Sequence, residues 1–133
     1  MKRKLTLALF AFLLISFFAC EEGPGEGGTS TIRGKVITRE YNGDFTISRG
    51  EYPAAKEDVY IIYGEDFVYG DRFETSYDGT YEFNYLRPGS YTVFAYSKDS
   101  TNLITDNRIP VVQEVEITKE NQTVEVPDII ILK

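Results

Sequence analysis

The sequence predicts an all-β fold, a seven-stranded antiparallel sandwich of two sheets. From Thr29 onward the chain consists of short runs rich in Val, Ile, Thr, Tyr and Phe, the residue types that favour strands. No stretch after residue 28 shows the sustained 3.6-residue apolar period of an amphipathic helix. Seven such runs within about a hundred residues, separated by turn signals, are typical of two packed antiparallel sheets.

The composition limits the kinds of site that this chain can carry. Its 133 residues allow one ordinary domain. With no His and a single Cys, it lacks the residues for a Ser-His-Asp or Cys-His nucleophilic site, an internal disulfide or a Cys-rich zinc site. The net charge of −7 disfavours nucleic acid, whose phosphates need a basic patch. We therefore expect no catalytic residue, no metal, no cofactor and no nucleic-acid partner.

Four of the carboxylates between positions 65 and 78 are the remaining source of possible chemistry. These residues are Glu65, Asp66, Asp71 and Asp78. Their side chains could supply a catalytic pair for glycoside hydrolysis or hard oxygen ligands for Ca²⁺. Their spacing selects no pair and does not match the EF-hand loop. Scattered acidic side chains are expected in a chain of this charge, so we do not predict an enzyme.

The first nineteen residues are predicted to be a signal peptide. Three basic residues at positions 2–4 precede an almost unbroken apolar run over residues 5–18, and Ala19 stands directly before Cys20. The run is too short and too unevenly flanked for a membrane span. The segment resembles the bacterial lipoprotein signal, in which Cys20 would carry the lipid. The alternative is an ordinary secretory signal followed by an incidental Cys.

Lipidation of Cys20 would make the membrane the first partner of this chain. Several acyl chains anchor a protein stably, whereas a single chain does so only marginally. Removal of residues 1–19 changes the net charge from −7 to −10, which favours solubility. We expect an outer-membrane lipoprotein of a bacterial cell envelope, facing either the periplasm or the cell surface.

Residues 20–28 are predicted to be a flexible acidic, Gly-rich tether, and residues 29–133 the sandwich domain. The segment from 21 to 28 has no apolar residue and five Gly or Pro in eight positions. Acidic residues after a lipidated Cys also resemble the surface-export signals of some Gram-negative lipoproteins. A spacer without sorting information would have the same composition.

The expected strands follow from alternating apolar and polar positions, with turn residues between them. They occupy residues 32–39, 58–63, 72–77, 81–85, 90–97, 111–118 and 123–132. The inner face of the first strand is expected to hold Ile32, Gly34, Val36 and Thr38, and that of the fourth Tyr81, Phe83 and Tyr85. Asp78-Gly79 fits a tight hairpin turn. The last two strands are expected to form a second hairpin around residues 119–122.

Several segments together resemble the carboxypeptidase regulatory-like domain, a transthyretin-like β-sandwich. The resemblance covers residues 31–133, and its most specific parts are the hairpin at Asp78-Gly79-Thr80-Tyr81 and the turn Leu86-Arg87-Pro88-Gly89-Ser90-Tyr91. It implies an accessory module without catalysis, of a kind appended to peptidases, outer-membrane receptors or surface lipoproteins. The related hydroxyisourate hydrolases use histidines, which this chain lacks.

The strand over residues 90–97 carries the first candidate binding residues. Tyr91 follows a Pro-Gly turn, where sandwich proteins often place a Tyr whose hydroxyl bonds to nearby backbone. If Tyr91 and its alternate neighbours point inward, Phe94 and Tyr96 point outward. Such a pair suggests a contact surface for a protein, unless a neighbouring loop covers it.

Two predicted loops carry the second set of candidates. Loops on a rigid sandwich often bind ligands, and aromatic rings beside Asp, Asn and Glu suit sugars. The loop over residues 40–53 contains Tyr41, Phe45 and Tyr52, and the loop over residues 64–71 contains Phe67 and Tyr69. Ordinary solvated loops have the same composition. The sequence thus favours a non-catalytic protein-interaction or assembly module of the envelope, with surface glycan binding as the alternative.

Overall fold

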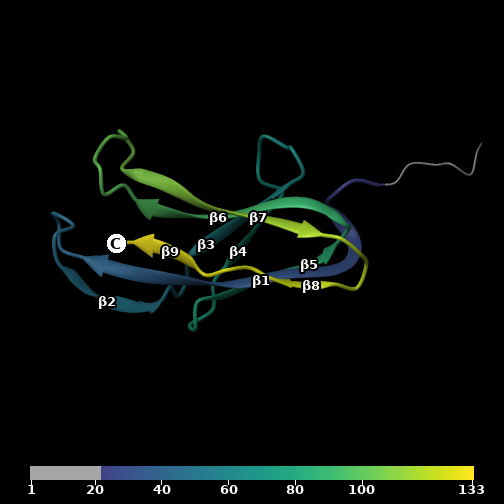
Figure 1. Cartoon of the computed structure of the whole chain (residues 1–133), viewed down its shortest axis with the longest axis horizontal. Coiled ribbons are helices and arrows are strands. Elements are labelled where there is room, and N and C mark those ends of the chain that lie inside the picture. Colours follow the sequence, from purple (N-terminus) through teal and green to yellow (C-terminus); the bar gives the residue numbers. More distant parts are fainter. Residues whose placement is uncertain (1–21) are drawn as a thin grey trace, which may run out of the picture.

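The computed structural model describes residues 22–133 as a two-layer β-sandwich (Figure 1). The predicted signal peptide and Cys20 lie outside these residues. The part described contains no helix that is long and apolar enough to cross a membrane. Its strands are β1 (Glu26–Tyr41), β2 (Ser48–Pro53), β3 (Asp58–Tyr63), β4 (Asp71–Glu74), β5 (Thr80–Leu86), β6 (Gly89–Lys98), β7 (Arg108–Ile117), β8 (Thr123–Glu125) and β9 (Ile129–Leu132).

The predicted all-β sandwich of two sheets is confirmed. One sheet has five strands and is built around β1, which pairs with β2, β5, β8 and β9. The other has four strands in the order β4-β3-β6-β7. The count over residues 22–133 is nine strands rather than seven, because the segment predicted as one long loop contains β2 and because the last predicted strand is divided in two.

The predicted hairpin between the last two strands is wrong. β7 lies at the edge of the four-stranded sheet, whereas β8 and β9 pair with β1 in the other sheet, and they pair in parallel. The chain therefore crosses between the layers after β7. Pro127 stands between β8 and β9, where its missing N–H interrupts the ladder. A hairpin would have placed β7 and β9 in one layer, but their buried side chains, such as Ile117 and Ile131, line the core from opposite layers.

The core lies between the sheets and follows the predicted alternation in most strands. Ile32, Val36 and Thr38 are buried on the inner side of β1, as predicted. Tyr81 and Phe83 are buried on β5. The residues that fill the core are Ile32, Val36, Ala54, Val59, Ile61, Tyr81, Phe83, Leu86, Tyr91, Val93, Ala95, Val115, Ile117, Val126, Ile129 and Ile131.

Tyr85 was predicted to point inward, and the structure shows it exposed. The register of β1 and β5 shifts between Ser30↔Leu86 and Ile32↔Phe83, so β5 holds one extra residue there. Tyr85 takes a positive φ of 59° at this bulge and turns outward, and Leu86 occupies the inner position. Tyr77 is exposed as well, because β4 ends at Glu74 and Tyr77 lies in the turn that follows.

Gly34 and Tyr81 form a tight contact inside the five-stranded sheet. A Cβ on Gly34 would lie 2.5 Å from the Tyr81 hydroxyl oxygen, so only glycine fits opposite this ring. The Tyr81 hydroxyl is buried and has no hydrogen-bond partner in the structure. Burial, followed by the negative charge of Asp128, raises the pKa of Tyr81 far above its usual value.

We expect Tyr81→Phe to leave the free energy of unfolding unchanged or to raise it by up to about 1 kcal/mol, since it removes a buried polar group without a partner. Urea unfolding at neutral pH measures the change. A loss of more than about 1 kcal/mol would contradict this packing, because it would mean that the hydroxyl is hydrogen-bonded after all.

Asp99 organises the loop between β6 and β7. Its carboxylate accepts hydrogen bonds from the backbone N–H groups of Thr101, Leu103 and Ile104, at 2.8, 2.9 and 3.1 Å, and from the Thr101 hydroxyl. The Thr101 hydroxyl contributes most to lowering the pKa of Asp99, followed by these N–H groups. The loop is therefore held in one conformation by a side chain that must be ionised.

Asp99→Ala should lower the melting temperature at pH 7, because the N–H groups in the loop lose their acceptor. The folded pKa of Asp99 is lowered, so its contribution is complete above the unfolded pKa of about 3.9 and is lost as the pH falls through the folded value. Melting curves of the two proteins should therefore converge in acid. A constant difference down to pH 2 would contradict this role for the carboxylate.

Candidate functional site

The outer side of the four-stranded sheet carries a group of aromatic side chains. Along β3 and β6 the inner positions are filled by core residues such as Val59 and Val93, so the alternate positions face away from the core. The structure places Phe94, half-buried, and Tyr96, 38% exposed, on this outer side. The orientation expected from the alternation in β6 is thus observed.

These side chains form a cluster, which we call the aromatic face, consisting of Tyr60, Tyr69, Phe94 and Tyr96. Tyr60 is the direct cross-strand partner of Phe94, and their rings stack with centroids 5.1 Å apart and 18° between planes. Tyr69, from the loop after β3, packs on Tyr60 at 4.8 Å. Tyr96 stands edge-on to Phe94 at 5.5 Å and to Tyr60 at 5.8 Å.

Charged side chains surround the aromatic face. The Arg108 guanidinium lies 4.8 Å from the centre of the Tyr96 ring, a cation–π distance. Arg72 pairs with Asp58 at 3.2 Å beside Tyr60. Partial burial, followed by the charge of Asp58, raises the pKa of Tyr60. This arrangement of packed rings and exposed charges is chemically suited to contact with another surface, with the rings as anchors and the ion pairs as a polar rim.

Rings in the aromatic face cover one another. Tyr60 and Phe94 each turn one ring face toward the other, and Arg108 lies over Tyr96. One face of each of these three rings is therefore occupied within the cluster. A sugar that stacks on an aromatic residue needs a free ring face, whereas a protein side chain can pack against edges equally well.

The candidates from the two predicted loops do not come together. Tyr41 and Phe45 lie near each other at the end of β1, with ring centroids 6.0 Å apart. Tyr52 is exposed on β2, which pairs with β1 in the five-stranded sheet. Tyr69 belongs to the aromatic face of the other sheet, and Phe67 is fully exposed at the tip of its loop. These five residues thus occupy different parts of the molecule.

Two larger clefts lie elsewhere on the sandwich. One of about 600 Å³ is bordered by Gly34, Tyr81 and Asp128 among others, and one of about 700 Å³ lies beside Arg87. Neither is lined by an aromatic residue from the two predicted loops. Within residues 22–133 no three Asp, Glu, Cys or His side chains are grouped so that they could hold a metal ion.

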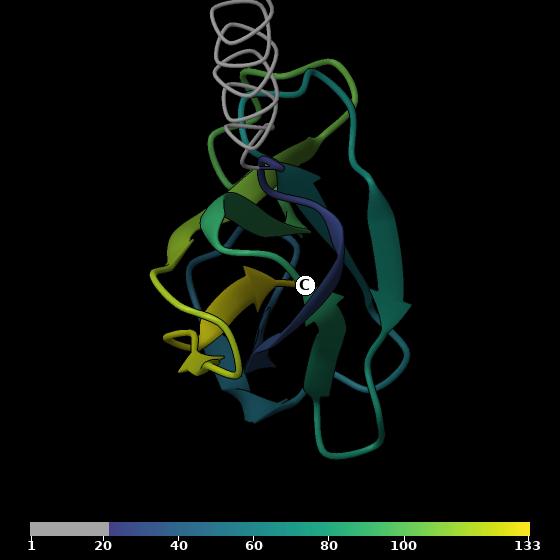
Figure 2. The same ribbon diagram turned by 90° about the vertical axis from the view of Figure 1, so that its right-hand side faces the viewer.

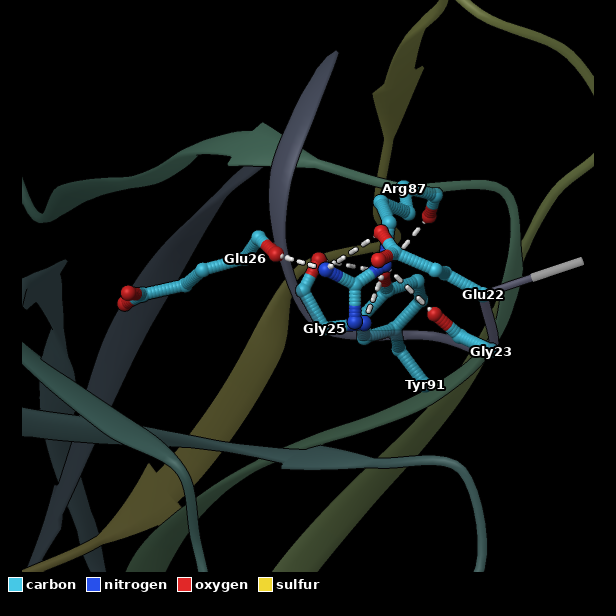
Figure 3. A network of polar contacts seen from close by, with 6 residues as sticks. All are labelled: Glu22, Gly23, Gly25, Glu26, Arg87 and Tyr91. Carbon is cyan, nitrogen blue, oxygen red and sulfur yellow. Dashed lines mark hydrogen bonds and ion pairs between the residues drawn. The ribbon is translucent and has the colours of Figure 1, made fainter. Parts of the chain in front are cut away.

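The N-terminal segment of the described chain is fastened to the sandwich by Arg87 (Figure 3). The Arg87 Nε donates a hydrogen bond of 2.7 Å to the Gly23 carbonyl, and its Nη1 donates another to the Glu26 carbonyl. The carboxylate of Glu22 lies 3.5 Å from the same guanidinium. This part of the predicted tether is therefore bound to the domain, and β1 already begins at Glu26.

Tyr91 completes the attachment of this segment and behaves as predicted from its place after the Pro-Gly turn. Its hydroxyl donates a hydrogen bond of 2.6 Å to the Arg87 carbonyl and accepts one of 2.8 Å from the N–H of Gly25. The Arg87 N–H in turn donates to the Gly25 carbonyl at 2.9 Å. Gly25 is buried and has a φ of 149°, which few other residues adopt.

Comparisons with known proteins give distant likenesses in fold. No protein-family model matches the chain, and no curated protein matches its sequence. The fold is similar to that of a Pseudomonas aeruginosa protein with a suggested carbohydrate-binding role, at 10% identity and a TM-score of 0.47 over 82% of this chain and 91% of that chain. It is also similar to (S)-allantoin synthase, at 13% identity and a TM-score of 0.41, over 79% of this chain and 42% of that chain. At these values, neither likeness carries an argument about binding or catalysis.

We expect Tyr91→Phe to reduce the free energy of unfolding by about 1–3 kcal/mol, because the Gly25 N–H would remain buried without an acceptor. Amide exchange at Gly25 and Glu26 should accelerate at the same time. The matched control is Tyr85→Phe, whose exposed hydroxyl makes no hydrogen bond in the structure and whose loss should change stability by less than about 0.5 kcal/mol. Equal effects of the two substitutions would contradict the role of Tyr91.

Proposed function

We propose that this chain is a lipid-anchored, non-catalytic protein-interaction module of a bacterial envelope, which docks its partner through the aromatic face. The observation that carries the proposal is the cluster of Tyr60, Phe94 and Tyr96 on an outer sheet surface. Clustered aromatic side chains with a nearby Arg are the usual energetic centre of a protein interface. Cys20 is the lipid attachment site in this proposal, and the outer membrane is the location.

The anchoring rests on the sequence of the first twenty residues, with its basic start, apolar run and Ala19-Cys20. We assign the sandwich to the carboxypeptidase regulatory-like type on the two turns that resemble it. The Tyr91 hydroxyl bond agrees with the second of these turns. In that group the domain is an accessory module, which fits binding rather than turnover.

Two carboxylates have structural roles, which fits a module without catalysis. A general acid at neutral pH needs a raised pKa, whereas the pKa of Asp78 and that of Asp99 are both lowered. In both cases the main cause is a hydrogen bond from the hydroxyl of a neighbouring threonine. These carboxylates hold turns in place.

A protein partner is favoured over a glycan by the geometry of the rings. In the stacked pair Tyr60 and Phe94, each ring has one face occupied by the other. The residues predicted for sugar binding, such as Tyr52 and Phe67, stand apart and line neither of the two larger clefts. Docking of a protein on the outer side of a sheet needs no such concave site.

The test is crosslinking and capture from the native envelope with the intact lipoprotein. We expect one specific partner, whose recovery falls at least tenfold with Tyr96→Ala, since a residue at the centre of an interface contributes at least about 1.4 kcal/mol. Tyr52→Ala is the matched control, with an exposed tyrosine on the other sheet, and should leave recovery unchanged. Cys20→Ala should release the protein from the membrane fraction.

Other outcomes would overturn parts of the proposal separately. Loss of capture with Tyr52→Ala or Phe67→Ala but not with Tyr96→Ala, together with binding to a glycan array, would favour the sugar-binding alternative. A Cys20→Ala protein that stays with the membrane would contradict the lipid anchor. Melting curves of each variant separate loss of the contact from loss of the fold.

A further inference from the structure

The loop between β3 and β4 presents an apolar tip to solvent. Phe67 is fully exposed and Val68 is 73% exposed, next to each other at the turn of the loop. Backbone hydrogen bonds hold the base of the loop, from Asp66 N–H to the Tyr63 carbonyl at 3.1 Å and from Gly70 N–H to the Ile61 carbonyl at 2.8 Å. The tip therefore projects from a fixed base. Two adjacent apolar side chains exposed at such a position suggest a contact surface.

The base of this loop touches the N-terminal segment. A Cβ on Gly64 would lie 3.0 Å from the Pro24 ring, so the two segments are in contact. Figures 1 and 2 show the start of the described chain, in purple, beside the teal loop that follows β3. The Arg87 contacts with Gly23 and Glu26 hold the N-terminal segment in this position.

Chain lengths then limit the distance from the loop tip to the lipid. From Pro24 back to Cys20 there are four residues, which span at most about 14 Å. From Gly64 to Val68 there are four residues, which span at most about 14 Å. Because Pro24 touches Gly64, the Cys20 position and the tip of the loop each lie within about 14 Å of this contact. A bilayer that holds the lipid is therefore within reach of Phe67.

We propose that Phe67 and Val68 enter the surface of the bilayer beside the lipid on Cys20 and give the sandwich a second point of contact with its own membrane. The inference rests on the lipid anchor of the proposed function. Two apolar side chains are too few to hold a protein on a membrane alone, so the contact depends on the anchor. It fixes the orientation of the domain, with the loop after β3 facing the lipid.

The charges of the loop determine which lipid suits it. Glu65 and Asp66 precede the tip and Asp71 follows it, and no basic residue lies between Gly64 and Asp71. Anionic headgroups would repel these carboxylates at short range. The contact therefore favours neutral or zwitterionic lipid, in which the carboxylates remain among the headgroups while the two apolar side chains reach deeper.

Single tryptophans provide the test, because the chain has no Trp of its own. Phe67→Trp reports on the loop tip. The matched control is Ile47→Trp, an exposed position in the turn between β1 and β2. Figure 1 shows this turn at the left end of the sandwich, away from the loop after β3. The full lipidated proteins are reconstituted in phosphatidylcholine vesicles that carry bromine on their acyl chains, and quenching of Trp fluorescence is measured.

We expect at least twofold stronger quenching at position 67 than at position 47, and weaker quenching at position 67 when half of the lipid is phosphatidylglycerol. A ten-residue Gly-Ser insertion between Glu21 and Glu22 should reduce the signal, since the anchor no longer holds the tip near the bilayer. Equal quenching at positions 67 and 47 in protein that co-floats with the vesicles would overturn the membrane contact alone. Protein that does not co-float would overturn the lipid anchor, and the contact with it.

Discussion

β1, with sixteen residues, holds the sandwich together, because other strands pair with it along both of its edges. Its first half lies between β5 and β8, and its second half lies between β2 and β9. Strands that are distant in sequence are thereby placed in one layer, and the other sheet closes over them. The start of β1 also directs the preceding residues to Arg87 and Tyr91, at the turn from which β6 begins. The N-terminal segment is thus attached at the turn from which β6, a strand of the other sheet, begins.

The alternation of a β-strand produces the core and the aromatic face at the same time. In β6 the inner residues Val93 and Ala95 are fully buried, and their neighbours Phe94 and Tyr96 are on the opposite side. β3 repeats the pattern in register, which brings Tyr60 next to Phe94. Any substitution that slips the register by one residue would move these rings into the core. Burial of the inner residues of β3 and β6 in the hydrophobic core therefore also fixes the positions of the rings that we propose for docking.

The sequence predicted those structural features that depend on residues close together in the chain. It did not predict the features that depend on contacts between distant segments. The sandwich, the inner face of β1 and the hydroxyl bond of Tyr91 all follow from alternation or from a short turn motif. The place of Tyr60 beside Phe94 depends on which strands pair, although the alternation around Tyr60 gave a signal that could have been used. The bulge at Tyr85, the parallel pairing of β9 and the binding of the Gly-rich segment to Arg87 have no local signature, since glycine carbonyls accept hydrogen bonds in any context.

The parallel pairing of β9 with β1 has a consequence for how the chain acquires its fold. Val36 pairs with Ile129 across most of the length of the chain, so the five-stranded sheet cannot close before the C-terminal strand is available. Pairings between such distant segments form slowly, because a long loop must be closed before the contact is gained. A chain that is still emerging from a ribosome or from a translocation channel would thus remain open until β9 appears. Such a delay would keep the polypeptide competent for threading through a narrow pore, which suits the envelope location that we propose.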